Sequence, residues 1–121
     1  MKALIIASMF AAFAAFAAFA GSASAAGNAD RGKLKADQVC AACHAVGGNW
    51  NKPLQPEYPL IAGQHKDYLM TVLNAYKQGE RSQIGRKNAI MAGQAATLSK
   101  QEIEDLATFL ASLPGPLHIK R

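Results

Sequence analysis

The sequence feature that most constrains the fold is the five-residue run Cys40-Ala41-Ala42-Cys43-His44. A C-x-x-C-H run is typical of a covalent attachment site for c-type haem, in which two thiols add across the two vinyl groups of one porphyrin. The histidine that follows is then placed to bind the iron. Because residues i, i+3 and i+4 of a helical turn share one face, all three side chains can point at the same macrocycle. A chain with this run is expected to fold around a large, flat cofactor.

Other kinds of site also use a C-x-x-C pair. A structural zinc site normally needs four ligands, usually in two spaced pairs. This sequence has no second cysteine pair, and His65 and His118 do not form an H-x-x-x-H arrangement. A thioredoxin-like dithiol lies near a β-α-β pattern, and we find no convincing strand pattern. Two incidental cysteines are the remaining alternative, and the run favours haem over all three.

Residues 1–25 are predicted to be a signal peptide rather than part of the fold. Lys2 gives a positive start, residues 3–20 are apolar apart from one serine, and Ala23-Ser24-Ala25 fits the small-residue pattern of a cleavage site. An uncleaved membrane anchor is the alternative, because about 18 apolar residues reach the lower limit of a membrane span. The pattern favours cleavage and export to the periplasm.

Cleavage after Ala25 or after Ala26 would leave one domain, residues 26–121, in which residues 117–121 are expected to be a loose tail. Both cysteines lie in the haem motif, so none is left for a structural disulfide. A chain of this size is small for a self-sufficient core. The haem would fill the interior, and we therefore expect the chain without haem to be largely unfolded.

The charge pattern excludes one class of partner and suggests another. The chain carries 13 lysines and arginines against 8 acidic residues, a formal net charge of +5. These positive residues are spread along the sequence and do not alternate with aromatic residues, so no nucleic-acid surface is predicted. A positive surface can steer association with an acidic protein partner or an anionic membrane face. We therefore expect partners with acidic docking surfaces. If the chain carries a haem, these partners would be redox proteins, among them a membrane oxidase or a dehydrogenase.

The first predicted element is a helix over about residues 28–42, which the haem motif closes. Gly32 is costly inside a helix, so the helix is weak or another backbone approaches it closely there. Residues 46–59 are predicted to form a loop because they are rich in glycine and proline. Trp50 and Tyr58 in this loop are expected to cover the haem.

A second helix is predicted over about residues 64–78, with Gly79 as its natural stop. It carries an apolar stripe at helical spacing. The stripe consists of Tyr68, Leu69, Val72, Leu73 and Tyr76. Residues 79–97 are polar and contain glycine, so they are predicted to be irregular, with a short apolar island at residues 89–91.

The last predicted helix covers about residues 99–113. Ser99 and Glu102 have the spacing of a capping box, which marks the start of a helix. Pro114 ends the helix. The predicted buried face consists of Ile103, Leu106, Ala107, Leu110 and Leu113.

The iron needs a second axial ligand opposite His44. Proteins with c-type haem often use methionine, which raises the reduction potential. Met91 is favoured because it lies in the predicted irregular stretch, where a loop could fold over the opposite face of the haem. Met70 falls about 60° beyond the edge of the apolar stripe on its helix and is a poorer candidate. His65 and His118 remain competing ligands.

Taken together, these residues resemble the small class I bacterial cytochromes c, particularly the short monohaem type similar to one half of the dihaem periplasmic cytochromes. The resemblance covers nearly all of residues 27–113. The matching segments are Cys40 to His44, Tyr58-Pro59-Leu60-Ile61-Ala62-Gly63-Gln64-His65 followed by Tyr68-Leu69, Lys77-Gln78-Gly79-Glu80-Arg81, and Met91 followed by Ala95 and Leu98-Ser99. The haem motif alone indicates only c-type attachment. The A-G-Q-H-x-x-Y-L segment and the methionine spacing indicate this smaller group of cytochromes.

The resemblance implies a role for each matching position. His44 is similar to the proximal iron ligand and Met91 to the distal one. Pro59 matches the proline whose carbonyl accepts a hydrogen bond from the proximal imidazole, a contact that orients the ring. Ile61 matches an apolar residue that packs against the haem. Cys40 and Cys43 would bind one haem c through two thioethers.

Two further positions gain a meaning from the resemblance. Gly32 and Phe109 look like the close contact between the first and last helices, which would explain the costly glycine. Arg81 is a weak candidate for contact with a haem propionate. The implied fold is all-α, the class I cytochrome c fold, with several helices wrapped around one covalent haem.

The resemblance implies a periplasmic monohaem cytochrome that carries single electrons between the redox partners of a respiratory or dehydrogenase chain. With both axial positions filled, no site is left for a small-molecule substrate, so an enzyme is not expected. A cytochrome subunit stably bound to a dehydrogenase or sulfur-oxidising enzyme is the alternative. A haem with an open distal site is a third reading, and carbon monoxide binding at neutral pH would support it.

Overall fold

The computed structural model describes residues 26–84 and 86–116, and within these ranges it contains helices and no strand. The predicted signal peptide, the predicted tail and His118 lie outside the described residues. The helices are α1 (Ala29–Val39), α2 (Ala41–His44), α3 (Lys66–Gln78), α4 (Ala89–Ala96) and α5 (Lys100–Ser112), with short 3-10 turns at Val46–Gly48 and Gly79–Arg81. The predicted all-α fold is confirmed. Within the described ranges, no helix is both long enough and apolar enough to span a membrane.

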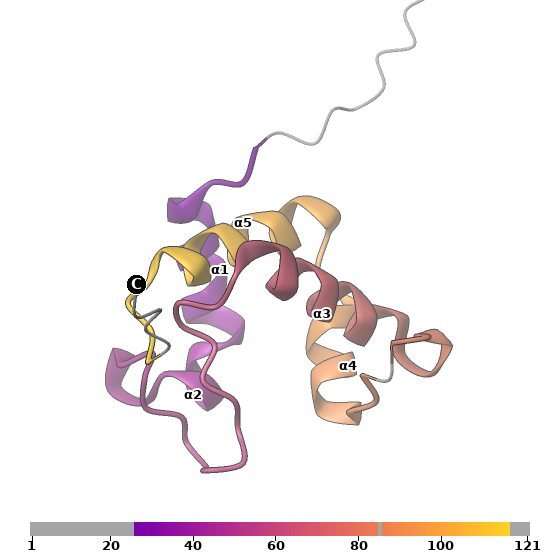
Figure 1. Ribbon diagram of the computed structural model, residues 1–121, viewed down its shortest axis with the longest axis horizontal. Helices are drawn as coiled ribbons and strands as arrows, with labels where there is room; N and C mark the ends of the chain where they lie inside the picture. The colour runs from indigo at the N-terminus through magenta and orange to yellow at the C-terminus, as the bar shows by residue number, and fades with distance from the viewer. Residues whose placement is uncertain (1–25, 85, 117–121) are drawn as a thin grey trace, which may run out of the picture.

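The helices form two levels in Figure 1. In the upper half α5 crosses α1, and α3 runs beside them. In the lower half α2 and α4 lie on opposite sides of the molecule. Among the described residues, the largest side chains that are fully buried are those of Ile103 and Leu106, both on α5. Helix α2 adjoins α1 and helix α4 adjoins α3, so the upper helices position α2 and α4.

The first predicted helix forms, but it divides into two pieces at the haem motif. The side chain of Asn28 caps α1 by accepting a hydrogen bond from the backbone N–H of Arg31 at 2.8 Å. At Cys40 the backbone departs from ideal helical geometry, with φ −110° and ψ −36°. The chain then resumes as α2, so Cys43 and His44 lie in a separate short helix that α1 carries.

Gly32 lies where α1 and α5 cross, as the resemblance to a family implies. A Cβ atom at this position would lie 2.0 Å from the carbonyl oxygen of Asp105 and 2.8 Å from the Cβ of Phe109. Contacts this short are sterically forbidden, so only glycine permits the crossing. The predicted contact between Gly32 and Phe109 is confirmed, and it explains why a poor helix former occupies the middle of α1.

The second predicted helix is confirmed as α3, which ends at Gly79 with φ 56°, a left-handed value that glycine adopts without steric cost. Leu69 and Ala75 are the buried residues of α3. Tyr68 belongs to the predicted apolar stripe, but 43% of its surface is exposed. Its hydroxyl accepts a hydrogen bond from the side chain of Arg86.

The prediction that residues 79–97 are irregular is wrong for the second half of this stretch. Residues Ala89–Ala96 form helix α4, which Asn88 caps by accepting a hydrogen bond from the backbone N–H of Met91 at 2.9 Å. This segment is rich in alanine, the strongest helix former. The single glycine, Gly93, destabilises the helix by less than the alanines stabilise it. Met91 therefore lies in the first turn of a helix rather than in a loop.

The last helix begins with the predicted capping box: the Ser99 hydroxyl accepts from the Glu102 backbone N–H at 3.1 Å, and the Glu102 carboxylate accepts from the Ser99 backbone N–H at 2.8 Å. The predicted buried face is confirmed except at Leu113, which follows the helix and is only partly buried. Phe109 and, unexpectedly, Asp105 complete that face.

Asp105 joins the start of α1 to the middle of α5, although it is only 3% exposed. Its carboxylate accepts hydrogen bonds from Arg31 Nε at 2.7 Å, Arg31 Nη2 at 3.0 Å, the Asn28 backbone N–H at 2.7 Å and Gln101 Nε2 at 3.0 Å. The hydrogen bonds from Arg31 and Asn28 outweigh the effect of burial and lower the pKa of Asp105 to about 2. A buried charge with this many donors stabilises the fold while it stays ionised.

We expect Asp105→Asn to lower the free energy of unfolding at pH 7 by about 1–3 kcal/mol, because it weakens charge-assisted hydrogen bonds at a buried position. The native pKa lies below the value of about 3.9 for an unfolded aspartate. The stabilisation is therefore complete above about pH 4 and is lost as the pH falls toward 2. Urea unfolding at several pH values would measure this, with the difference between the two proteins shrinking in acid.

Asp37→Asn is the matched control for this prediction. Asp37 pairs with Lys33 at 2.6 Å on the exposed face of α1, and an exposed ion pair of this kind contributes about 0.5 kcal/mol or less. An equal loss of stability in the two variants would contradict a special role for the buried carboxylate.

Candidate functional site

The two cysteines and the histidine of the motif lie in one helical turn. The backbone carbonyl of Cys40 accepts hydrogen bonds from the N–H groups of Cys43 at 3.2 Å and His44 at 3.0 Å. Both thiols are free and partly buried, whereas His44 is only 6% exposed. The turn is thus formed and closed by its own backbone, and it brings two sulfurs and one imidazole together.

The imidazole of His44 is oriented by the loop that follows α2. Its Nδ1 lies 3.0 Å from the carbonyl oxygen of Pro59, which can only accept, so Nδ1 carries the proton and donates. This tautomer leaves Nε2 with a free lone pair. Because second contacts of this kind fix the ring and raise its basicity, His44 has the electronic form of a metal ligand.

The environment of Cys40 favours an uncharged sulfur. Burial, with a further contribution from the neighbouring Cys43, raises the pKa of Cys40 to about 11. A thiolate is therefore disfavoured at this position at neutral pH. A thioether carries no charge, so a sulfur bonded to carbon suits this apolar site.

One aromatic ring lies beside the imidazole, and other apolar side chains attach the loop to the rest of the fold. The ring of Tyr58 lies 6.0 Å from that of His44, centroid to centroid. Trp50 is buried and packs edge-on against Phe109 at 5.6 Å, so it also anchors the loop to α5. Ile61 is partly buried and packs against the main hydrophobic cluster. These contacts fix the loop that carries Pro59.

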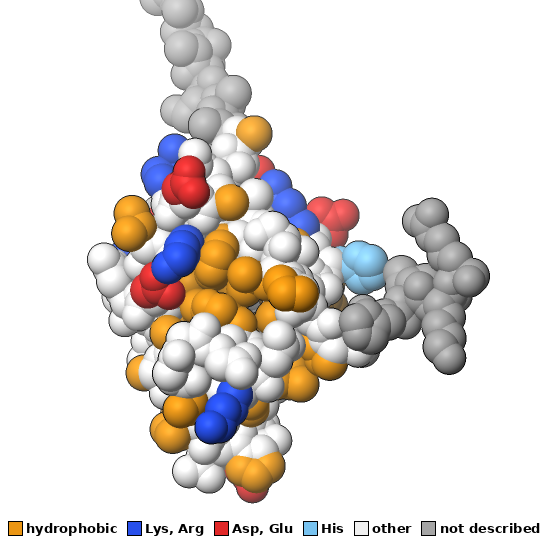
Figure 2. Space-filling view, turned by 90° about the vertical axis from the view of Figure 1, so that its left-hand side faces the viewer, with side chains coloured by type: hydrophobic (Ala, Val, Ile, Leu, Met, Phe, Trp, Pro, Cys, Tyr) orange, Lys and Arg blue, Asp and Glu red, His pale blue; other side chains and the backbone are white. Residues whose placement is uncertain are grey.

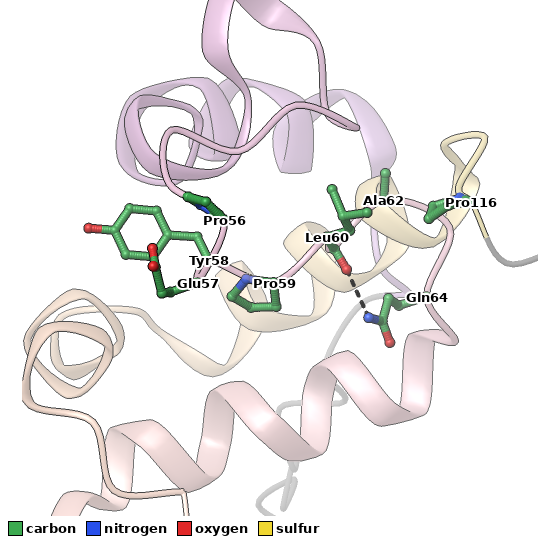
Figure 3. Close-up of a pocket in the computed structure, with 8 residues that line it drawn as sticks. All are labelled: Pro56, Glu57, Tyr58, Pro59, Leu60, Ala62, Gln64 and Pro116. Carbon is green, nitrogen blue, oxygen red and sulfur yellow. Dashed lines mark hydrogen bonds between the residues drawn. The ribbon is translucent and has the colours of Figure 1, made fainter.

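A pocket of about 360 Å³ opens beside the same loop. Figure 3 shows the eight residues that line it, which come from the loop, the start of the segment leading to α3, and the chain after α5. Gln64 Nε2 donates to the carbonyl of Leu60 at 2.9 Å and so braces the loop across one turn. The sequence analysis missed this role of Gln64. Its place in the A-G-Q-H segment indicated that Gln64 matters, but the sequence does not show that it bonds to the carbonyl of Leu60.

The residues proposed as distal ligands lie in different surroundings. Met91 is partly buried in the first turn of α4, on the opposite side of the molecule from α2 (Figure 1). Met70 is partly buried and packs against the main cluster from α3. His65 is exposed at the start of α3. Arg81, the candidate for a propionate contact, is also exposed, at the end of a short turn.

The observations above show that this arrangement of residues fits a haem group. The buried sulfur of Cys40 favours an uncharged state. The Cys43 thiol and the imidazole of His44 come from the same turn, and the hydrogen bond from His44 Nδ1 leaves Nε2 to bind a metal. Figure 2 shows hydrophobic side chains gathered near the middle of one face, with charged side chains around them. The fold and site together define a small all-α protein suited to a covalently attached haem.

Comparison with known proteins identifies the family. Residues 29–114 match the family model described as Cytochrome c. Cytochrome c-554(547) of Halothiobacillus neapolitanus is 34% identical over 93 residues, which cover 72% of this chain and 98% of that protein. The chain belongs to the cytochrome c family, whose members are electron-transfer proteins that bind haem c covalently.

Two further relatives are longer proteins that match this chain over only part of their length. Cytochrome c4 of Stutzerimonas stutzeri is 40% identical over 93 residues, covering 74% of this chain and 42% of that protein. A protein named thiosulfate dehydrogenase electron acceptor, from Thiomonas intermedia, is 35% identical over 83 residues, covering 64% of this chain and 35% of that protein. The chain thus spans less than half the length of these two relatives, in agreement with the resemblance to one half of a dihaem protein.

Proposed function

We propose that this chain is a periplasmic one-electron carrier that holds a single haem c. The observation that carries the proposal is the hydrogen bond from His44 Nδ1 to the carbonyl of Pro59, in the same turn as two free cysteines. This bond commits the imidazole to the tautomer that binds a metal through Nε2. The relationship to cytochromes of similar length supports a carrier that acts as a single domain.

Each site residue has a distinct part in this proposal. Cys40 and Cys43 form the two thioethers. His44 from α2 and Met91 from α4 would bind the iron. The haem supplies a reversible one-electron change of its iron. Pro59 orients the His44 ring through its carbonyl, and Ile61 packs against the macrocycle. If both side chains hold the metal, the protein would exchange electrons without binding a substrate there.

We also propose that residues 1–25 direct export and that residues 26–121 are the working domain. The match to the family model begins at residue 29, which supports this division. A haem bound to the periplasmic chain would exchange electrons with redox proteins in brief encounters. The net positive charge favours partners with acidic docking surfaces, through long-range attraction that raises the association rate.

A second candidate is a cytochrome dedicated to a sulfur-oxidising dehydrogenase. It is favoured by the relatives named thiosulfate dehydrogenase electron acceptor. Purification of the native protein distinguishes the two candidates. A monomer that dissociates rapidly from its partners supports the free carrier, whereas stable copurification with a dehydrogenase supports the subunit.

Met91→Ala tests the distal ligand. We expect the oxidised protein to lose the weak near-infrared band that methionine sulfur gives, and we expect its reduction potential to fall, because the identity of the axial ligand sets much of that potential. Absorption spectroscopy and redox titration measure the two effects. Met70→Ala is the matched control and should keep the band.

Two results would contradict the proposed site. Loss of the band in Met70→Ala, with retention in Met91→Ala, would move the distal ligand to α3. Carbon monoxide binding to the reduced wild-type protein at neutral pH, without unfolding, would indicate an open distal position and a ligand-binding role instead of a carrier.

A further inference from the structure

Helix α4 is held against α3 by two side-chain contacts, one near each of its ends. At its C-terminal end, Lys77 Nζ donates a hydrogen bond to the backbone carbonyl of Leu98, two residues beyond the helix. At its N-terminal end the contact comes from Arg86, two residues before the Asn88 cap. The segment that carries Met91 thus lies between two attachment points on one neighbouring helix.

The contact of Arg86 with Tyr68 has two components. Arg86 Nη2 donates to the Tyr68 hydroxyl at 2.6 Å, and the guanidinium carbon lies 5.7 Å from the centre of the Tyr68 ring. A guanidinium over an aromatic face is attracted by the ring quadrupole, and its planar shape allows hydrogen bonding at the same time. Tyr68 precedes Leu69, which is buried in the core, so this end of α3 is firmly placed.

The other described contacts near the start of α4 are weaker. Lys87 pairs with Glu80 at 3.4 Å, but both side chains are exposed, and pairs of this kind contribute little in water. The Ile84 backbone N–H lies 3.4 Å from the Ser82 hydroxyl, which is long for a hydrogen bond. Among the described residues leading into α4, Arg86 therefore makes the strongest contact with the rest of the fold.

We propose that Arg86 is a positioning residue for the distal ligand: by holding the start of α4 on Tyr68, it sets how readily the Met91 sulfur leaves the iron. The inference rests on the proposed role of Met91. A methionine can leave only if its backbone moves away or its side chain swings aside. Fixing the backbone five residues before Met91 restricts the first of these routes.

The test is a titration of the oxidised holoprotein with imidazole, which competes with the methionine for the iron. We expect Arg86→Ala to raise the apparent affinity for imidazole about fivefold, the effect of losing one hydrogen bond to a charged group at an exposed site. Tyr68→Phe keeps the ring and removes the hydroxyl, so its increase should be smaller. The double variant should exceed Arg86→Ala only slightly, because both changes remove the same contact.

Two controls separate positioning from general weakening. Lys87→Ala removes a neighbouring positive charge without touching Tyr68 and should leave imidazole affinity unchanged. Asp105→Asn lowers global stability from the crossing of α1 and α5 and should also leave it unchanged. An equal rise in affinity for Asp105→Asn would overturn the proposal, since instability alone would then explain the effect.

Unchanged imidazole affinity in Arg86→Ala would also overturn the proposal while leaving the proposed function intact. The reverse case is recognised separately. Retention of the near-infrared band in Met91→Ala would refute the distal ligand itself, whatever the arginine variants do.

Discussion

Replacing both Cys40 and Cys43 with alanine is expected to give a chain that carries no covalent haem and has lost most of its helical structure. The reason lies in the composition of the core. Six of the thirteen buried hydrophobic residues in the described ranges are alanines. Alanine side chains supply little buried apolar area, and apolar burial stabilises by only about 25 cal/mol per Å². The protein part alone therefore provides a weak core.

The geometry of the lower half adds to this expectation. α2 and α4 lie on opposite sides of the molecule (Figure 1), where α2 adjoins α1 and α4 adjoins α3. A cofactor bound to side chains of both would link them. A ligand that binds only the folded state stabilises it by mass action, and a covalent one cannot be diluted away.

The measurement is mass spectrometry and circular dichroism on protein exported by a host equipped for haem attachment. The wild-type chain should carry the mass of one haem, and the double variant none. Ala42→Ser is the matched control, because Ala42 lies between the two cysteines and is exposed. It should keep both the haem and the helical signal. A double variant with a native helical signal would show that the helices need no cofactor.

Features encoded in short stretches of sequence were predicted well. The haem motif, the capping box of α5 and the glycine at the end of α3 each depend on residues a few positions apart, and all are present in the structure. A close backbone approach was one of two explanations for a glycine inside the first helix, and the contact of Gly32 with Phe109 was implied by the resemblance to a family. The hydrogen bond between His44 and Pro59 was implied by resemblance to a family rather than by the local pattern.

Features that depend on distant partners were not predicted. Asp105 reads as a charged residue in a helix, and nothing near it shows that Arg31, 74 positions away, would neutralise it in the core. The contact of Arg86 with Tyr68 joins two elements across 18 positions. Helix α4 was not predicted for another reason. Gly93 and the polar residues before the helix indicated irregular structure, although residues 89–96 are rich in alanine.

Gly32→Ala is expected to destabilise the protein, against the usual effect of this substitution. Alanine in the middle of a helix is normally more favourable than glycine by about 1 kcal/mol. At Gly32 the new Cβ would lie 2.0 Å from the carbonyl oxygen of Asp105, which belongs to the backbone and cannot rotate away. The two helices would have to separate, and overpacking of this kind typically costs about 1–3 kcal/mol.

Gly93→Ala is the matched control because it places the same change in another helix. A Cβ at Gly93 would meet nothing within 4 Å. At 100° per residue, Gly93 lies about 160° around the helix from Met91, on nearly the opposite face. This variant should be more stable than the wild type by about 0.5–1 kcal/mol. Chemical denaturation of the two holoproteins would measure opposite signs for one chemical substitution. If both variants were stabilised, α1 and α5 would have room to spare at their crossing, and the close approach would not be what requires glycine there.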